Sequence, residues 1–152
     1  MASDALWDIR WLILSEHISQ WSKDKSTKVG CVVVGNANQV LSLGYNGFPR
    51  GIDDHKPERH ERPAKYKWAE HAERNAVYNA ARTGTSLVGS DLYVPFFPCA
   101  DCARAIVQAG IARVITRLPS SYSAEFTARW ETDFKVSNEM FMETGIEVRY
   151  VS

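Results

Sequence analysis

Apolar residues recur at helical spacing along the first part of the chain. From about Ser3 to Trp21 this spacing predicts an amphipathic helix, because one face of a helix collects positions three and four residues apart. The expected buried stripe consists of six apolar residues: Leu6, Ile9, Ile13, Leu14, Ile18 and Trp21. His17 falls on this stripe, so we expect it to be packed and hydrogen-bonded in the core. Trp7 and Trp11 lie off the stripe, which favours a contact surface for a partner.

Two further runs predict β-strands. The run from Val29 to Val34 is β-branched and continuous, as in a buried central strand. A turn at residues 35–39 leads into a second run, Val40 to Tyr45. We therefore expect the two strands to form an antiparallel hairpin.

The periodic pattern breaks up between Asn46 and Lys67, where prolines, glycines and charged residues alternate. Stretches of this length without regular structure are usually functional or disordered, and this one directly precedes the most informative motif of the chain. We therefore expect a functional loop. His55 and His60 lie in it without any cysteine, and we expect them to be solvated rather than to bind a second metal ion.

The second half of the chain alternates helical and strand patterns. The predicted elements are a helix at Trp68 to Thr83, a strand at Asp91 to Phe96, a helix at Cys99 to about Gln108, a strand at Ala112 to Arg117, a helix around Phe134, Met140 and Phe141, and a strand at Ile146 to Val151. A helix between the last two strands implies a right-handed parallel crossover. The predicted fold class is α/β, a three-layer α/β/α domain on a mixed five-stranded sheet, in one domain spanning residues 1–152.

Composition narrows the classes of function. The 152 residues carry 18 Lys and Arg against 18 Asp and Glu. This balance argues against a broad basic surface for nucleic acid and favours a small substrate. Three cysteines without a disulfide framework favour a reducing, cytoplasmic location. The first residues lack a basic signal region, and no run of about 18 apolar residues predicts a membrane span.

Two short motifs carry the chemistry: His71-Ala72-Glu73, and Pro98-Cys99-Ala100-Asp101-Cys102. A catalytic zinc ion takes three protein ligands and a water, which matches His71, Cys99 and Cys102. The two cysteines are three apart and share one face at the start of a helix, while His71 is expected at the very start of its own helix. Glu73 remains free to move protons. This arrangement is a known signature of zinc nucleobase deaminases.

Other readings of the cysteine pair are a redox centre or half of a structural zinc finger. A finger needs a fourth ligand, and the remaining cysteine, Cys31, lies in an apolar run typical of a core. A non-catalytic, zinc-stabilised binding module is the rival from another class. Glu73 argues against it, because a structural site has no use for an unliganded carboxylate there.

Several segments together resemble the deoxycytidylate deaminase family. They are Ser22-Lys23-Asp24, Val29-Gly30, Gly44-Tyr45-Asn46-Gly47-Phe48-Pro49, His71-Ala72-Glu73-Arg74-Asn75-Ala76, Phe97-Pro98-Cys99 and Gln108-Ala109-Gly110-Ile111. The resemblance implies that dCMP loses its 4-amino group as ammonia to give dUMP, with a zinc-activated water attacking C4. Glu73 then carries the protons.

The resemblance also implies further substrate contacts. Asn46 is expected to hold the sugar or the base, and the backbone at Gly30 and Cys31 to line the pocket. Tyr122 falls where the family has a tyrosine beside the phosphate. Three basic residues are candidates for the phosphate itself: Lys23, Lys28 and Arg50.

Family members are typically hexamers that dCTP activates and dTTP inhibits, with effectors near the Gly44–Gly47 loop. For this chain the resemblance therefore implies a homo-oligomer, with Mg²⁺ as a candidate companion of a nucleotide effector. Alternative substrates are dCTP and another cytosine or guanine compound. Cys31 stands where the family commonly has alanine.

Overall fold

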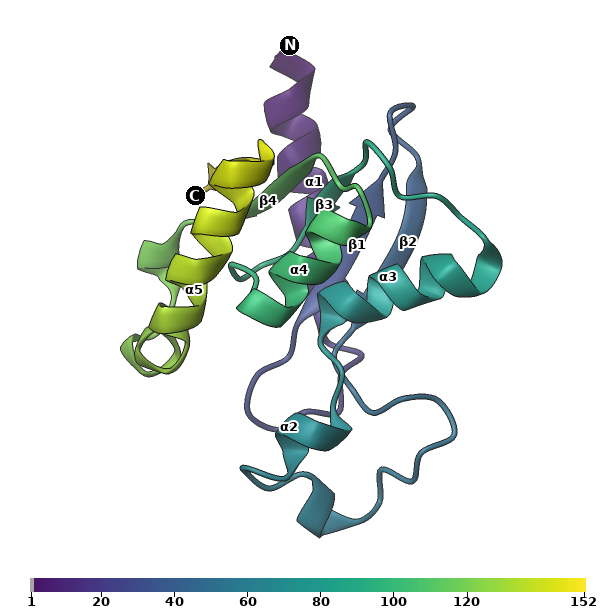
Figure 1. The fold of residues 1–152 in the computed structure, drawn as a ribbon, viewed down its shortest axis with the longest axis vertical. Coiled ribbons are helices and arrows are strands. Elements are labelled where there is room, and N and C mark those ends of the chain that lie inside the picture. Colours follow the sequence, from purple (N-terminus) through teal and green to yellow (C-terminus); the bar gives the residue numbers. More distant parts are fainter. Residues whose placement is uncertain (1) are drawn as a thin grey trace.

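The computed structural model describes residues 2–152 and contains a five-stranded sheet with the strand order β2-β1-β3-β4-β5 (Figure 1). The strands are β1 (Gly30–Val34), β2 (Val40–Tyr45), β3 (Asp91–Tyr93), β4 (Arg113–Arg117) and β5 (Glu147–Val151). The α-helices are α1 (Ala2–Ser19), α2 (Lys65–Trp68), α3 (Ala72–Thr83), α4 (Ala100–Gln108) and α5 (Ala124–Thr144), and short 3-10 turns lie at Pro57–Arg59 and Pro119–Ser121. Among the residues described, no helix combines the length and apolarity needed to span a bilayer.

The pairing of the strands confirms the predicted mixed sheet. β1 runs antiparallel to both β2 and β3, while β3, β4 and β5 are mutually parallel. The long helix α5 makes the crossover between β4 and β5. Helix α1 lies on one face of the sheet and α3, α4 and α5 lie on the other, which gives three layers (Figure 1).

Alternate side chains of the interior strand β1 point to opposite faces of the sheet and pack into the two halves of the core. Cys31 and Val33 on β1 pack against the face covered by α3 and α4, whereas Val32 and Val34 pack against α1. All four side chains are at least 97% buried. A continuous apolar run is therefore required, because both faces of this strand are covered.

The buried face of α1 differs from the predicted stripe. Its buried residues are Asp8, Leu12, Ser15, Ile18 and Ser19, whereas Leu6, Ile9, Ile13 and Trp21 are 40 to 54% exposed. Close packing selects this face: a Cβ added to Gly30 would lie 2.1 Å from the carbonyl oxygen of Ser15. Only small side chains fit where β1 approaches so closely. His17, predicted in the core, is exposed and meets the ring of Trp21 edge to face.

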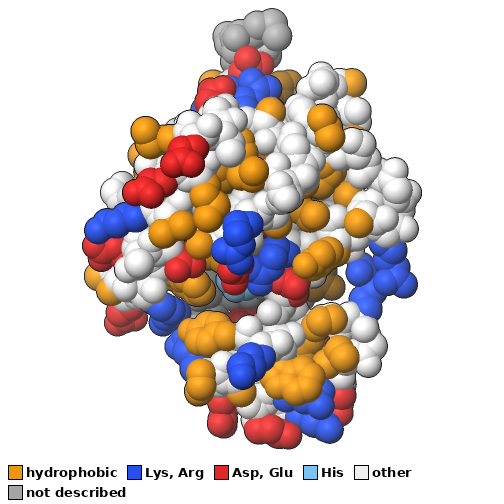
Figure 2. All heavy atoms as spheres, in the orientation of Figure 1, with side chains coloured by type: hydrophobic (Ala, Val, Ile, Leu, Met, Phe, Trp, Pro, Cys, Tyr) orange, Lys and Arg blue, Asp and Glu red, His pale blue; other side chains and the backbone are white. Residues whose placement is uncertain are grey.

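The second predicted helix begins later than expected. Trp68 ends the single-turn helix α2, and the chain is extended at Ala69 and His71 before α3 begins at Ala72. The segment between β2 and α3 forms a lobe below the sheet in Figure 1, and Figure 2 shows a hollow between this lobe and the rest of the molecule. The lobe forms one side of the candidate active site. The predicted long loop is thus present, with α2 and a 3-10 turn inside it.

Candidate active site

Three side chains that could hold a metal ion converge where α3 and α4 begin. His71 is the N-cap residue of α3 and Cys99 that of α4, and both have extended backbone that turns the side chain towards the other helix. The Nδ1 atom of His71 lies 3.4 Å from the Sγ of Cys99 and 3.5 Å from that of Cys102. Ligands around a tetrahedral zinc ion, with bonds of about 2.1 Å to nitrogen and 2.3 Å to sulfur, stand about 3.5 Å apart. The group therefore fits zinc in both donor type and spacing.

The two thiols differ in acidity because they share a hydrogen bond. The thiol of Cys102 and then the His71 ring stabilise the Cys99 thiolate, which lowers the pKa of Cys99 to about 4. The same contact with Cys99, together with burial, raises the pKa of Cys102. The lowered pKa favours the thiolate form of Cys99 as a metal ligand, and a divalent cation would favour ionisation of the second thiol as well.

Glu73 lies beside this group at the floor of a pocket. Its side chain is buried, with the residue 5% exposed, and it lines the same pocket as His71 and Cys99. Burial raises its pKa, although the neighbouring His71 opposes the change. A carboxyl group with a raised pKa at neutral pH suits a residue that both accepts and donates a proton.

Arg74 lies close to the two cysteines, and the motifs in the sequence did not indicate a role for it at the site. Burial would lower its pKa, but the charge interaction with the neighbouring Cys102 and the hydrogen bond and charge of Glu70 outweigh this and raise it. Its guanidinium forms an ion pair with Glu70 and lies 3.5 Å from Asp101. Its positive charge offsets the negative charge that two thiolates bring into a partly buried site.

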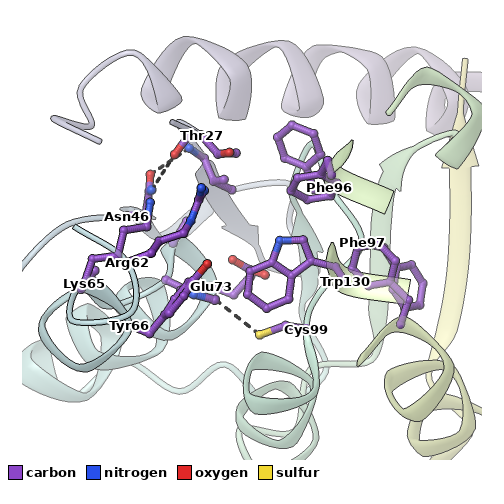
Figure 3. Close-up of a pocket in the computed structure, with 16 residues that line it drawn as sticks. Thr27, Asn46, Arg62, Lys65, Tyr66, Glu73, Phe96, Phe97, Cys99 and Trp130 are labelled. Atoms are coloured by element: carbon purple, nitrogen blue, oxygen red, sulfur yellow. Dashed lines mark hydrogen bonds between the residues drawn. The ribbon is translucent and has the colours of Figure 1, made fainter. Parts of the chain in front are cut away.

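The pocket has two contrasting sides (Figure 3). Thr27, Asn46, Arg62, Lys65 and Tyr66 lie on one side, and an aromatic wall faces them. This wall consists of Phe96, Phe97, Phe126, Trp130 and Phe134. Polar groups opposite aromatic rings are common in sites that bind an aromatic heterocycle with a polar substituent.

Helix α5 contributes three rings of this wall, one turn apart, from Phe126, Trp130 and Phe134. The indole of Trp130 meets the His71 ring edge to face, at 5.8 Å between centroids. Sequence reasoning placed this helix only as a crossover. The repeat of aromatic residues at every fourth position was the signal that could have found the wall.

Asn46 lines the pocket, but its side chain also fastens the surrounding loops. Its Oδ1 atom accepts a hydrogen bond from the Val29 amide, and its Nδ2 atom donates to the Thr27 carbonyl, each at 2.8 Å. The amide group therefore sets the shape of the polar side of the pocket. Its second N–H and the second lone pair of its oxygen are what it can offer to a ligand.

The three predicted phosphate ligands lie elsewhere in the structure. Lys23 is exposed and pairs with Asp54 at 2.9 Å, and Lys28 is exposed outside the pocket lining. Arg50 donates to the side chain of Asn79 on α3. None of the three lines the pocket that contains Glu73. The basic residues that do line it are Arg62 and Lys65, in the loop where periodicity offered no signal.

Three other residues expected to contact the substrate do not line this pocket: Tyr122, Gly30 and Cys31. The hydroxyl of Tyr122 accepts from the Phe97 amide and donates to the Arg117 carbonyl, so it supports the chain before Cys99 rather than facing the pocket. Gly30 packs against α1, and Cys31 is fully buried next to the carboxyl of Glu73. Val29, their neighbour, supplies the pocket surface instead.

Residues 6–118 match the family model of the cytidine and deoxycytidylate deaminase zinc-binding region. The chain belongs to this family. It is 38% identical over 145 residues to an uncharacterized deaminase of Aliivibrio fischeri, covering 95% of this chain and 93% of that protein. It is 32% identical over 140 residues to the deoxycytidylate deaminase of Mus musculus, covering 89% of this chain and 78% of that enzyme.

Solved structures of the family share the fold. The dCMP deaminase of the cyanophage S-TIM5 superposes with a TM-score of 0.73 at 28% identity, covering 95% of this chain and 96% of that chain. A second structure of that enzyme, in complex with dCMP and dUMP, gives the same TM-score at 29% identity. The α/β deaminase fold predicted from the sequence is therefore confirmed.

Proposed function

We propose that this chain, as a single domain, hydrolyses dCMP to dUMP and ammonia. The observation that carries the proposal is the position of Glu73 beside the His71, Cys99 and Cys102 group, at the floor of a pocket walled by aromatic rings. Family membership and the likeness to an enzyme solved with dCMP and dUMP support the choice of substrate.

The residues have distinct roles in this reaction. Zinc held by His71, Cys99 and Cys102 would make a water molecule nucleophilic at neutral pH. Glu73 takes a proton from the attacking water and delivers it to ring nitrogen N3 of cytosine. It then takes the remaining proton from the hydroxyl group at C4 and gives it to the amino group, which leaves as ammonia while the C4 carbonyl forms, so one carboxyl serves as base and acid. Water addition and ammonia loss balance the conversion of the amidine to a carbonyl.

The aromatic wall suits the base. A pyrimidine that reaches Glu73 lies between the ring of Trp130 and the loop carrying Asn46. Stacking against such rings stabilises a base by about 1–3 kcal/mol in other nucleic-acid sites. Burial by these rings also keeps bulk water from Glu73, which strengthens its electrostatic interactions.

The test is a substrate panel on zinc-loaded protein, with ammonia release measured for dCMP, dCTP, deoxycytidine and guanine. We expect dCMP to have the highest kcat/KM. A higher kcat/KM for dCTP or guanine would show that the proposed substrate is wrong, although the proposed deamination reaction would stand. Zinc binding without turnover of any of the four would favour the rival reading, a zinc-stabilised binding module.

We also propose that the chain assembles with copies of itself. The outer face of α1, opposite its buried face, exposes Leu6, Ile9 and Ile13. The tryptophans that the sequence pattern predicts for this role are less suited, because Trp11 is partly buried and hydrogen-bonded to Asn38, with Trp7 stacked on it. Light scattering at micromolar concentration tests the proposal, and a strictly monomeric mass would contradict it.

We further propose that the enzyme is cytoplasmic, with reduced cysteines. We also propose that dCTP and dTTP regulate it, each bound together with Mg²⁺. A hollow of about 360 Å³ beside the Gly44–Gly47 loop supports it, since this is room for a small ligand. The hollow is lined by aromatic and basic residues that include Tyr45, Tyr78, Arg50 and Arg82. Saturation curves for dCMP that do not change when Mg²⁺ and either triphosphate are added would refute the regulation.

A further inference from the structure

The pocket contains a cationic corner away from the metal-binding group. Of the 16 residues that line the pocket, only Arg62 and Lys65 are lysine or arginine. In Figure 3 both lie on the polar side with Thr27 and Asn46, opposite the aromatic wall. A cytosine whose C4 reaches Glu73 has its sugar and 5′ substituent directed away from that floor.

The corner is built by contacts between two loops. The Nη2 atom of Arg62 donates to the Ser26 hydroxyl at 2.6 Å. The ammonium of Lys65 lies 3.2 Å from the Asp24 carboxylate, and both side chains are at least 84% buried. Asp24 in turn accepts hydrogen bonds from the amides of Ser26 and Thr27, at 2.8 and 3.0 Å. The turn at residues 24–27 is therefore held in one shape, with the Ser26 hydroxyl beside Arg62 and Thr27 on the pocket lining.

Charge distinguishes the two basic residues. Asp24 neutralises Lys65, whereas Arg62 has no acidic partner in residues 2–152 and only a neutral hydroxyl accepts from it. An unneutralised guanidinium beside a hydroxyl group, on the same side of the pocket as an ammonium, offers the fork geometry and donors that a phosphate dianion requires.

We propose that Arg62, with Lys65 and the Ser26–Thr27 hydroxyls, binds the 5′-phosphate and makes the site selective for a nucleoside monophosphate. This inference rests on the proposed function and names the residues that determine its substrate class. Arg62 supplies the positive charge for the direct contact, and Lys65, paired with Asp24, holds the turn at residues 24–27 in position.

The experiment compares Arg62→Gln and Arg62→Lys with Lys67→Gln, a matched loss of charge on α2 outside the pocket. For each zinc-loaded protein we measure kcat/KM on dCMP and on deoxycytidine. We expect the ratio of dCMP to deoxycytidine to fall at least about tenfold in Arg62→Gln, to recover partly in Arg62→Lys, and to stay unchanged in Lys67→Gln. An equal loss on both substrates, or no loss on dCMP, would show that Arg62 only fastens the loop to Ser26 and would overturn the proposal.

A binding measurement separates this inference from the proposed function. Calorimetry with dUMP and deoxyuridine reports on the phosphate even if the wild-type protein deaminates neither substrate. We expect Arg62→Gln to weaken dUMP alone, at least about tenfold. Unchanged dUMP affinity in a folded Arg62→Gln protein would overturn the assignment, whereas absent turnover with intact, Arg62-dependent dUMP binding would overturn only the proposed reaction.

Discussion

Gly44 on β2 lies against Ala72 at the start of α3 with no room for a side chain between them. A Cβ on Gly44 would stand 2.5 Å from the Ala72 carbonyl oxygen and 2.5 Å from the Ala76 amide. Both of these are backbone atoms that cannot rotate away. This contact fixes the distance between the sheet and the helix that carries His71 and Glu73.

We therefore predict that Gly44→Ala destabilises the protein by about 2–3 kcal/mol, because α3 must shift to relieve the overlap. Zinc affinity should weaken with it, since His71 moves away from the cysteines. Gly47→Ala is the matched control, because no atom lies within 4 Å of its added Cβ. Urea unfolding of the two variants tests the prediction, and equal stability would contradict the close contact.

Removal of either cysteine ligand should remove the metal. We expect purified wild-type protein to contain one zinc ion per chain, and Cys99→Ala or Cys102→Ala to retain less than about a fifth of it, because two protein ligands bind zinc far more weakly than three. Cys31→Ala is the control for the same substitution in the core. Elemental analysis provides the measurement, and full occupancy after Cys99→Ala would refute the ligand set.

Replacement of Glu73 should separate chemistry from binding. Glu73→Gln preserves the shape of the side chain but cannot carry a proton, so kcat should fall by about 10³-fold or more. Zinc content and affinity for dUMP should change little, because neither depends on proton transfer. Near-normal turnover by this variant would exclude Glu73 as the proton carrier.

Asp24 should make stability depend on pH in the acid range. Burial alone would raise the pKa of its carboxyl, but hydrogen bonds from the Thr27 and Ser26 amides and the charge of Lys65 outweigh burial and lower it below the usual 3.8. A lowered pKa in the folded state contributes stability above the unfolded-state pKa, and this stability is lost as the pH falls through the folded-state value.

Thermal unfolding of Asp24→Asn should therefore show a loss of about 1–2 kcal/mol at pH 7 and a smaller further loss than wild type below about pH 4. The amide keeps an acceptor for the turn, so the difference reports on the charge. If the free energies of unfolding of the two proteins fall in parallel over about three pH units below pH 5, the lowered pKa of Asp24 is contradicted.

The hairpin, the parallel crossover and the metal-binding group could be predicted from the sequence, because each depends on local order. β1 and β2 are separated by a short turn, so their alternating patterns specify the pairing. Cys99 and Cys102 share one helical face by spacing alone, and a histidine two residues before a glutamate requires the irregular backbone of a helix start. These local rules needed no knowledge of the partners across the fold.

Only the tertiary structure decided which side of α1 is buried and which basic residues enter the pocket. Helix α1 is apolar around much of its circumference, so periodicity could not choose between faces, and the close approach of Gly30 to Ser15 made the choice. Arg62 and Lys65 reach the pocket through contacts with Ser26 and Asp24, which lie far away in the chain. Such contacts arise when two loops without periodic structure meet at the same end of the sheet, and their energies depend on three-dimensional neighbours rather than on spacing along the sequence.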